Sequence, residues 1–311
     1  MVGRRGGPEE RIVPEAGFDL ETIAIQGLNR DALLSNLALP AVLPAAFARG
    51  VALVDSFLPD VVLGVGGYAM APALVGARLR RVPYVLHEQN VVPGLATRLF
   101  AGGAAAICTT FAGTRVQGAV EVTGLPLRGG FQPRTPADPP RVLLITGGSQ
   151  GAFKINAAVW ACLDELLSRY QEVIHLTGRQ GAEEAEKRSR PGYTVQAFSD
   201  DMAGLLARTD LVVSRAGVGT LAELTAVGLP SVLVPGTFGG GHQEHNAAAL
   251  VDAGAAVRLG DRELSPQTLL ATIEGLDRDR LRAMAAAATA MGRRDAASRV
   301  LAVLRRVVAG S

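Results

Sequence analysis

Residues 210–246 constrain the fold more than any other stretch of this chain: DLVVSRAGVGTLAELTAVGLPSVLVPGTFGGGHQEHN. The pattern predicts a short buried strand, a glycine turn, a helix, a second buried strand and a glycine-rich loop that leads into another helix. A strand that enters a helix through a glycine turn leaves free backbone N–H groups and the positive end of the helix dipole at one place. Because such a place binds phosphate, the stretch predicts an α/β sheet with a diphosphate at its edge.

Polar side chains near this turn indicate what else the ligand carries. Glu223 lies one turn into the predicted helix, and Gln243 and Asn246 follow the second strand. Their donors and acceptors suit sugar hydroxyls and the edge of a base, so the stretch predicts a nucleotide-sugar site. A purely structural alternative stays open, because Thr220 and Glu223 have the spacing of a capping box.

Composition bounds the class of protein. The 311 residues suffice for two domains, and 48% hydrophobic with 19% charged residues is typical of a globular protein. The formal net charge of +2 gives no reason to expect a nucleic-acid partner. Cys108 and Cys162 lie in apolar surroundings without a partner motif, which predicts a reduced compartment, no disulfide and no metal site. We also expect no signal peptide and no membrane span, because no apolar run reaches about 18 residues.

The first part of the chain predicts a strand within residues 18–25 and two or more helices within residues 29–57, broken at Pro40 and Pro44. Their apolar stripe is typical of a helix packed on a sheet. Alternatively, part of the stripe contacts a membrane, with Arg30, Arg49 and the basic cluster at residues 78–81 touching anionic lipid.

Residues 60–88 form a predicted strand–turn–helix–strand unit with the turn GVGGYA. That turn satisfies the pattern G-x-G-x-x-A, and Glu88 ends the next strand where a ribose-binding acid would lie. A nicotinamide-dependent oxidoreductase is therefore an alternative from another reaction class. The polar sequence HEQN at residues 87–90 predicts the edge of a site, although a capped loop would explain it as well.

The proline-rich residues 129–140 (GGFQPRTPADPP) predict a linker between a domain of residues 1–128 and a domain of residues 141–311. The second domain begins with a strand, the turn GGSQG at residues 147–151 and a helix over residues 152–167. The sequence D-x-D at residues 277–279 predicts an acidic helix start rather than a metal site. Two such α/β units predict two Rossmann-like domains facing a cleft, the GT-B architecture of glycosyltransferases.

The segments GVGGY, HEQN, GLPLR, GGSQG, FSDDM, SRAGVGTLAEL and HQEHNAAAL occur in an order that closely resembles one family. The chain resembles the bacterial N-acetylglucosaminyltransferases of peptidoglycan synthesis (MurG). The resemblance implies an inverting transfer of N-acetylglucosamine from UDP-N-acetylglucosamine to lipid I, the undecaprenyl-diphosphate-muramyl-pentapeptide, which gives lipid II. It also implies a peripheral enzyme on the cytoplasmic face of the cell membrane that needs no metal or other cofactor.

The resemblance assigns roles to individual residues. Glu223 would hold the ribose hydroxyls, the backbone near Ser199 would lie at the uracil, and the turn Val218-Gly219-Thr220 would face the diphosphate. Further donor contacts would come from Asn90, Arg128, Ser149 and Gln243. On the acceptor side would lie Gly66, Gly67 and Tyr68.

One departure from the family is large. Members of the family begin with a strand, a turn of the form GGTGGH and a helix, and the histidine of that turn is the family's candidate for the catalytic base. The given sequence does not contain this unit, so either it starts upstream of Met1 or the chain is a UDP-sugar-binding remnant without catalysis. Within the given sequence, His87 and Glu88 are the candidates for the base that the acceptor hydroxyl needs.

Overall fold

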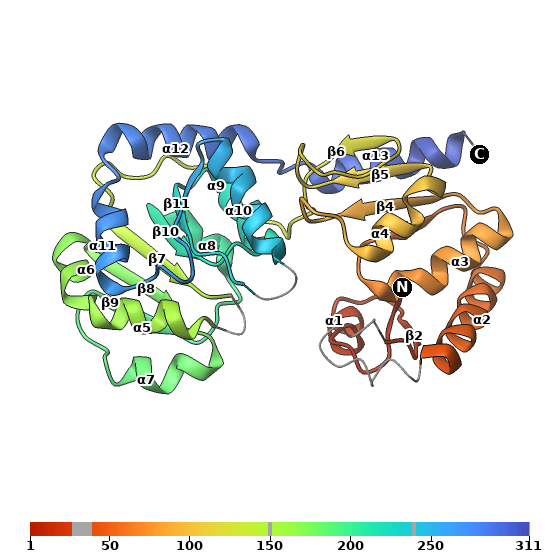
Figure 1. Cartoon of the computed structure of the whole chain (residues 1–311), viewed down its shortest axis with the longest axis horizontal. Helices are drawn as coiled ribbons and strands as arrows, with labels where there is room; N and C mark the ends of the chain where they lie inside the picture. Colours follow the sequence, from red (N-terminus) through yellow and green to blue (C-terminus); the bar gives the residue numbers. More distant parts are fainter. Residues whose placement is uncertain (27–38, 149–150, 238–240, 311) are drawn as a thin grey trace. The chain divides into compact units, whose positions relative to one another are not determined.

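The computed structural model describes residues 1–26, 39–148, 151–237 and 241–310 (Figure 1). The chain forms two compact units. Unit 1 comprises Met1–Thr123 and Ser298–Ser311, and unit 2 comprises Gly124–Ala297. Each unit is built on its own parallel sheet, with helices packed against it.

Unit 1 contains a four-stranded parallel sheet in the order β3-β4-β5-β6 and a separate parallel pair, β1-β2. The strands are β1 (Val2–Arg4), β2 (Glu21–Ile23), β3 (Val62–Gly64), β4 (Tyr84–Glu88), β5 (Ala106–Thr109) and β6 (Val120–Val122). The helices are α1 (Glu9–Glu15), α2 (Leu39–Phe57), α3 (Ala71–Arg80), α4 (Leu95–Phe100) and α13 (Ala296–Ala309), with 3-10 turns η2 (Tyr68–Met70) and η3 (Ala101–Gly103).

Unit 2 contains a six-stranded parallel sheet in the order β12-β11-β10-β7-β8-β9, with helices on both faces (Figure 1). The strands are β7 (Val142–Thr146), β8 (Glu172–Leu176), β9 (Tyr193–Gln196), β10 (Leu211–Ser214), β11 (Ser231–Leu233) and β12 (Ala256–Arg258). The helical segments are α5 (Phe153–Ala161), α6 (Leu163–Arg169), η4 (Arg179–Gly181), α7 (Ala182–Glu186), α8 (Met202–Arg208), α9 (Val218–Val227), α10 (His242–Asp252), α11 (Pro266–Glu274) and α12 (Arg278–Met291).

The strand order of unit 2 fixes where a ligand can bind. Counted from β7, the order is 6-5-4-1-2-3, so the direction of winding reverses between the adjacent strands β7 and β10. In doubly wound sheets, ligands bind in the crevice outside the carboxyl ends of the strands at such a reversal. The carboxyl ends of β7 and β10, where Thr146 lies opposite Ser214, therefore locate the candidate site.

The domain prediction is wrong at the C-terminus. Residues 141–311 were expected to form the second domain, but Ser298–Ser311 belong to unit 1. The apolar face of α13 places Val300 and Val303 against Val85 and Cys108 of the unit 1 sheet. Figure 1 shows α13 alongside β5 and β6. Burial of this apolar face stabilises the arrangement.

The proline-rich residues 129–140 also differ from the expected free linker, because they belong to unit 2. The buried carboxylate of Asp210 accepts hydrogen bonds from the Arg134 guanidinium at 2.5 Å and from the backbone N–H of Ala137 at 2.7 Å. The backbone N–H groups of Arg141 and Val142 donate to its other oxygen, at 2.9 and 3.0 Å. One buried aspartate thus fastens the start of β7 and the preceding segment to the amino end of β10.

Most predicted elements are present, with local differences in two helical regions. The helix expected over residues 152–167 is two helices, α5 and α6, which meet at Cys162. The predicted break of the first helical region at Pro44 is wrong, because Pro44 lies inside α2. Pro40 is in the first turn of α2, where a helix needs no N–H donor. Residues 29–38 of that prediction lie outside the described residues.

Candidate functional site

Glycines shape the turn that joins β7 to α5. Gly151 has φ +78°, which favours glycine, and a Cβ at this position would collide with the carbonyl oxygen of Thr177. The backbone N–H of Gly151 donates to the carbonyl of Gly148 at 2.9 Å, and α5 begins two residues later. The N-cap is Ala152, whose side chain cannot accept a hydrogen bond, so among the described residues α5 begins without a side-chain cap.

The helix after β10 also begins without a side-chain cap. Its N-cap is Gly217 and its first residue is Val218, two residues before the start predicted at Thr220. Thr220 is therefore inside the helix and not at its N-cap, and Gly217 makes no side-chain cap hydrogen bond, so the capping-box alternative for Thr220 and Glu223 is wrong. A Cβ built on Gly217 or Gly219 would meet no atom within 4 Å, so the approach to this helix end is open.

Glu223 lies half-buried on α9 and makes no hydrogen bond to another described residue. Burial raises the pKa of this carboxyl above its usual value, and the nearby charge of Arg128 lowers it in part. Arg128 itself is exposed. A desolvated carboxylate without a protein donor is disfavoured in the free protein, so a ligand that donates hydrogen bonds would bind it strongly.

The other residues of unit 2 that were predicted to contact the nucleotide sugar lie in different surroundings. Gln243 is the second residue of α10, and its Oε1 accepts a hydrogen bond from the backbone N–H of Gly236 at 2.8 Å. Asn246 is only 1% exposed, which contradicts a role in binding the edge of a base. The hydroxyl of Ser199 accepts a hydrogen bond from the N–H of Asp201 at 3.2 Å and stays half-exposed ahead of α8. Ser149 lies outside the described residues.

In unit 1 the predicted acceptor-side residues follow the carboxyl end of β3. Gly66 and Gly67 have φ of +96° and +70°, and a Cβ on either would meet no atom within 4 Å. Tyr68 begins η2, and its hydroxyl accepts a hydrogen bond from the Arg4 guanidinium at 3.1 Å. The side-chain amide of Gln89 donates to the carbonyl of Val65 at 3.1 Å and joins this turn to the loop after β4.

Glu88 holds the loop after β4 in place. It is 3% exposed, and its two oxygens accept hydrogen bonds from the backbone N–H groups of Asn90 at 3.0 Å and Gly94 at 3.1 Å. This carboxylate is therefore not available to a ribose, which removes the main support for the nicotinamide alternative. His87 is also 3% exposed. The burial of both side chains argues against either of them as the catalytic base.

Three charged residues beside the site escaped the sequence analysis: Lys154, Arg215 and Asp261. They lie at the carboxyl side of the unit 2 sheet. Lys154 and Arg215 each form a salt bridge with the carboxylate of Asp261, with N–O distances of 2.7 Å and 2.6 Å. Separations of 107 and 46 residues along the chain leave no local pattern that would reveal these contacts. Among the described residues, no group of histidine, cysteine or carboxylate side chains is arranged to hold a metal ion.

Comparison with known proteins places the chain in a family. Residues 1–109 match the glycosyltransferase family 28 N-terminal domain, and residues 142–300 match the glycosyltransferase family 28 C-terminal domain. The chain is 41% identical to the UDP-N-acetylglucosamine–N-acetylmuramyl-(pentapeptide) pyrophosphoryl-undecaprenol N-acetylglucosamine transferase of Syntrophotalea carbinolica, over 99% of this chain and 89% of the relative. The protein of the same name from Nocardioides sp. is 39% identical, over 100% of this chain and 90% of the relative.

The chain belongs to the MurG family. The crystal structure of Acinetobacter baumannii MurG matches with a TM-score of 0.83 at 27% identity, covering 98% of this chain and 90% of that one. The fold class is thus the two-domain α/β GT-B architecture, as the sequence predicted, and the MurG family is the one that the sequence motifs indicated.

Proposed function

We propose that this chain transfers N-acetylglucosamine from UDP-N-acetylglucosamine to lipid I, with inversion at the anomeric carbon, and so makes lipid II for peptidoglycan. The observation that carries the proposal is the reversal point of the unit 2 sheet. There α5 and α9 follow adjacent parallel strands and, within the described part of the chain, begin without side-chain caps. Helix α9 also carries Glu223, whose carboxylate accepts no hydrogen bond from a described residue. The MurG relatives, which bear the name of this reaction, support it.

Different residues of unit 2 bind different parts of the donor. The backbone of Val218, Gly219 and Thr220 binds the diphosphate, and Glu223 accepts hydrogen bonds from the ribose hydroxyls. The segment at Ser199 lies at the uracil. Breaking the bond between sugar and phosphate leaves negative charge on UDP, and the open helix end stabilises that charge in the transition state. Further contacts to the donor come from the other residues that the family resemblance implies: Arg128, Ser149 and Gln243 of unit 2, and Asn90 of unit 1.

Unit 1 takes the acceptor, with Gly66, Gly67 and Tyr68 at its binding loop. The two glycines have positive φ and no atom within 4 Å of a built Cβ, which leaves room for a bulky substrate beside the backbone. His87 and Glu88 shape the neighbouring loop in this proposal and do not remove the proton of the acceptor hydroxyl, because both are buried. Glu88 keeps Asn90 in position through the backbone contact described above.

A peripheral position on the cytoplasmic face of the membrane completes the proposal. Within the described residues, no helix combines the length and apolar character that crossing a bilayer requires. Phe57 and Leu58 at the end of α2 are 81% and 80% exposed, and Leu79 near the end of α3 is 63% exposed. Arg78 and Arg80 flank Leu79 in the sequence and Arg81 follows, and this mixture of apolar and basic side chains suits a surface of anionic lipid. Arg80 also pairs with Asp55 at 2.5 Å. Of the other predicted lipid contacts, Arg49 pairs with Glu21 and Arg30 lies outside the described residues.

The experiment is a transfer assay with the purified chain, labelled UDP-N-acetylglucosamine and lipid I in detergent. We expect labelled lipid II and released UDP in equal amounts. Calorimetric titrations with UDP-N-acetylglucosamine and NADH accompany the assay. Donor binding without transfer would support the remnant alternative, preferential binding of NADH would support the oxidoreductase, and absence of donor binding would refute the proposed function.

A further inference from the structure

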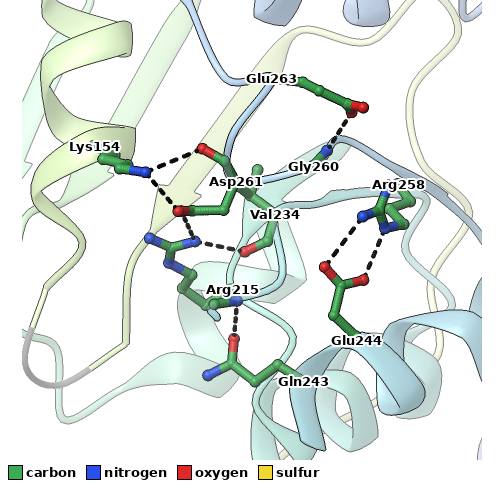
Figure 2. A network of polar contacts seen from close by, with 10 residues as sticks. Lys154, Arg215, Val234, Gln243, Glu244, Arg258, Gly260, Asp261 and Glu263 are labelled. Atoms are coloured by element: carbon green, nitrogen blue, oxygen red, sulfur yellow. Dashed lines mark hydrogen bonds and ion pairs between the residues drawn. The ribbon is translucent and has the colours of Figure 1, made fainter. Parts of the chain in front are cut away.

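One carboxylate joins the two segments that flank the reversal point of the unit 2 sheet. Asp261 follows β12 and is 8% exposed. Its Oδ2 accepts a hydrogen bond from Lys154 Nζ at 2.7 Å, and its Oδ1 accepts one from Arg215 Nη1 at 2.6 Å. Figure 2 shows both cationic side chains pointing toward this carboxylate.

The partners of Asp261 lie at the beginnings of α5 and α9, the two helices that the proposed function places at the diphosphate. Lys154 is the second residue of α5. Arg215 follows the last residue of β10 and precedes the Gly217 cap of α9 by two residues. Arg215 Nη1 also donates to the carbonyl of Val234 at 3.0 Å, which ties the same position to the end of β11. Asp261 therefore fastens the beginnings of two helices to each other through one side chain.

The surroundings make these contacts strong and specific. The side chains of Arg215 and Asp261 are 12% and 7% exposed, so water screens their attraction little. Burial by itself would raise the pKa of Asp261, but the hydrogen bonds from Lys154 and Arg215 outweigh it and lower the pKa below the usual value. The carboxylate is therefore charged at neutral pH. Removal of that charge would leave the buried Arg215 guanidinium without its counter-ion.

We propose that Asp261 is a positioning residue for the donor diphosphate. It holds the beginnings of α5 and α9 in the arrangement in which both helix ends act on one diphosphate. The inference rests on the proposed function, because it assumes that the donor binds at this reversal point. It predicts that substitution of Asp261 weakens the binding of the phosphate part of the donor and leaves the binding of the nucleoside part unchanged.

Calorimetric titration of the whole chain with UDP and with uridine tests this division. We expect Asp261→Asn to raise the Kd for UDP about tenfold, which is typical when a group that orients a binding site is lost. The Kd for uridine should change by less than about twofold, since uridine has no phosphate for the helix ends to bind.

Asp210→Asn is the matched control. Asp210 is also buried and paired with an arginine, at 2.5 Å, but it lies at the amino end of β10 while Arg215 lies at the carboxyl end. Both substitutions should lower the melting temperature, and only Asp261→Asn should change the ratio of the two Kd values. Lys154→Met provides a second variant that folds, because the Lys154 side chain is 55% exposed, and it should weaken UDP selectively to a smaller extent.

The outcomes distinguish a failure of the positioning role of Asp261 from a failure of the proposed function. If the unsubstituted chain binds neither UDP nor UDP-N-acetylglucosamine, the proposed function fails. If it binds both, and Asp261→Asn and Lys154→Met weaken UDP and uridine equally or leave both unchanged, the positioning role is refuted while the function stands.

Discussion

The most specific prediction concerns Glu223. Its charged carboxylate should lower the stability of the ligand-free protein and raise the affinity for the donor. Its half-buried carboxylate accepts no hydrogen bond from the residues that the structure describes, and burial raises its pKa. An acid whose pKa is raised by folding contributes stability below its usual pKa and loses that contribution as the pH rises through the folded value. The charged form of Glu223 is therefore the form that destabilises the ligand-free protein.

Glu223→Gln removes the charge and keeps the shape. Glutamate and glutamine have similar helix propensities, and no hydrogen bond to a described residue is lost. We expect the melting temperature at pH 7.5 to stay constant or rise by up to about 3 °C, equivalent to about 1 kcal/mol for a domain of this size. Donor binding should weaken by about 2 kcal/mol, or about 30-fold in Kd, because hydrogen bonds from the ribose to a charged group are lost.

Thermal unfolding and calorimetric titration with UDP-N-acetylglucosamine measure the two effects on the same samples. Glu186→Gln is the control, because Glu186 is an exposed helical glutamate of unit 2 and should change neither quantity. Any gain in melting temperature from Glu223→Gln should also disappear at acidic pH, where Glu223 is protonated. A melting temperature several degrees lower with an unchanged Kd would show that Glu223 serves the fold, and would refute the ribose assignment.

Four further substitutions test the glycine turns, a buried histidine and a helix cap of unit 2. Gly151→Ala should destabilise the protein by more than about 1 kcal/mol in urea unfolding, because its φ is +78° and the new methyl group meets the Thr177 carbonyl. Gly219→Ala, with nothing within 4 Å, should not destabilise, and a loss of stability there would contradict the open helix end. Burial lowers the pKa of His175 to about 3, so stability should fall by about 1.4 kcal/mol per pH unit from about pH 6 to pH 4. His175→Gln should flatten that dependence, and an equal slope in the variant would refute it. Asp277→Ala should cost about 1 kcal/mol, because the Asp277 carboxylate caps α12 through the N–H of Arg280 at 2.8 Å, and an unchanged unfolding midpoint would contradict the cap.

Local patterns predicted the strands and glycine turns well for a physical reason. Residues 60–65 and 210–214 are short apolar runs bounded by glycine or polar residues, and a parallel strand covered on both faces needs such a run. The helix start at Asp277 was likewise visible, because a cap involves residues three positions apart. The position of β10 next to β7 was not visible, since chain order alone does not fix the order of strands in a sheet.

The roles of charged side chains were the least predictable part of the site. Thr220 and Glu223 have the sequence of a capping box, yet α9 begins two residues earlier and leaves Glu223 without a cap partner. Glu88 occupies the position of a ribose-binding acid, yet both oxygens are used by its own loop. In each case the backbone geometry decides which groups the carboxylate contacts, and the local sequence motif does not determine that geometry.

The sequence by itself determined the α/β class, the two glycine turns of the donor domain and the family, because these depend on residues close together along the chain. The tertiary structure alone decided that α13 packs on the first unit, that Asp210 fastens residues 134–142, and that Asp261 joins Lys154 to Arg215. Asp261, for example, lies 107 positions from Lys154 and 46 positions from Arg215 along the chain. Such pairs form only after packing has brought whole strands together, so no periodicity in the sequence records them.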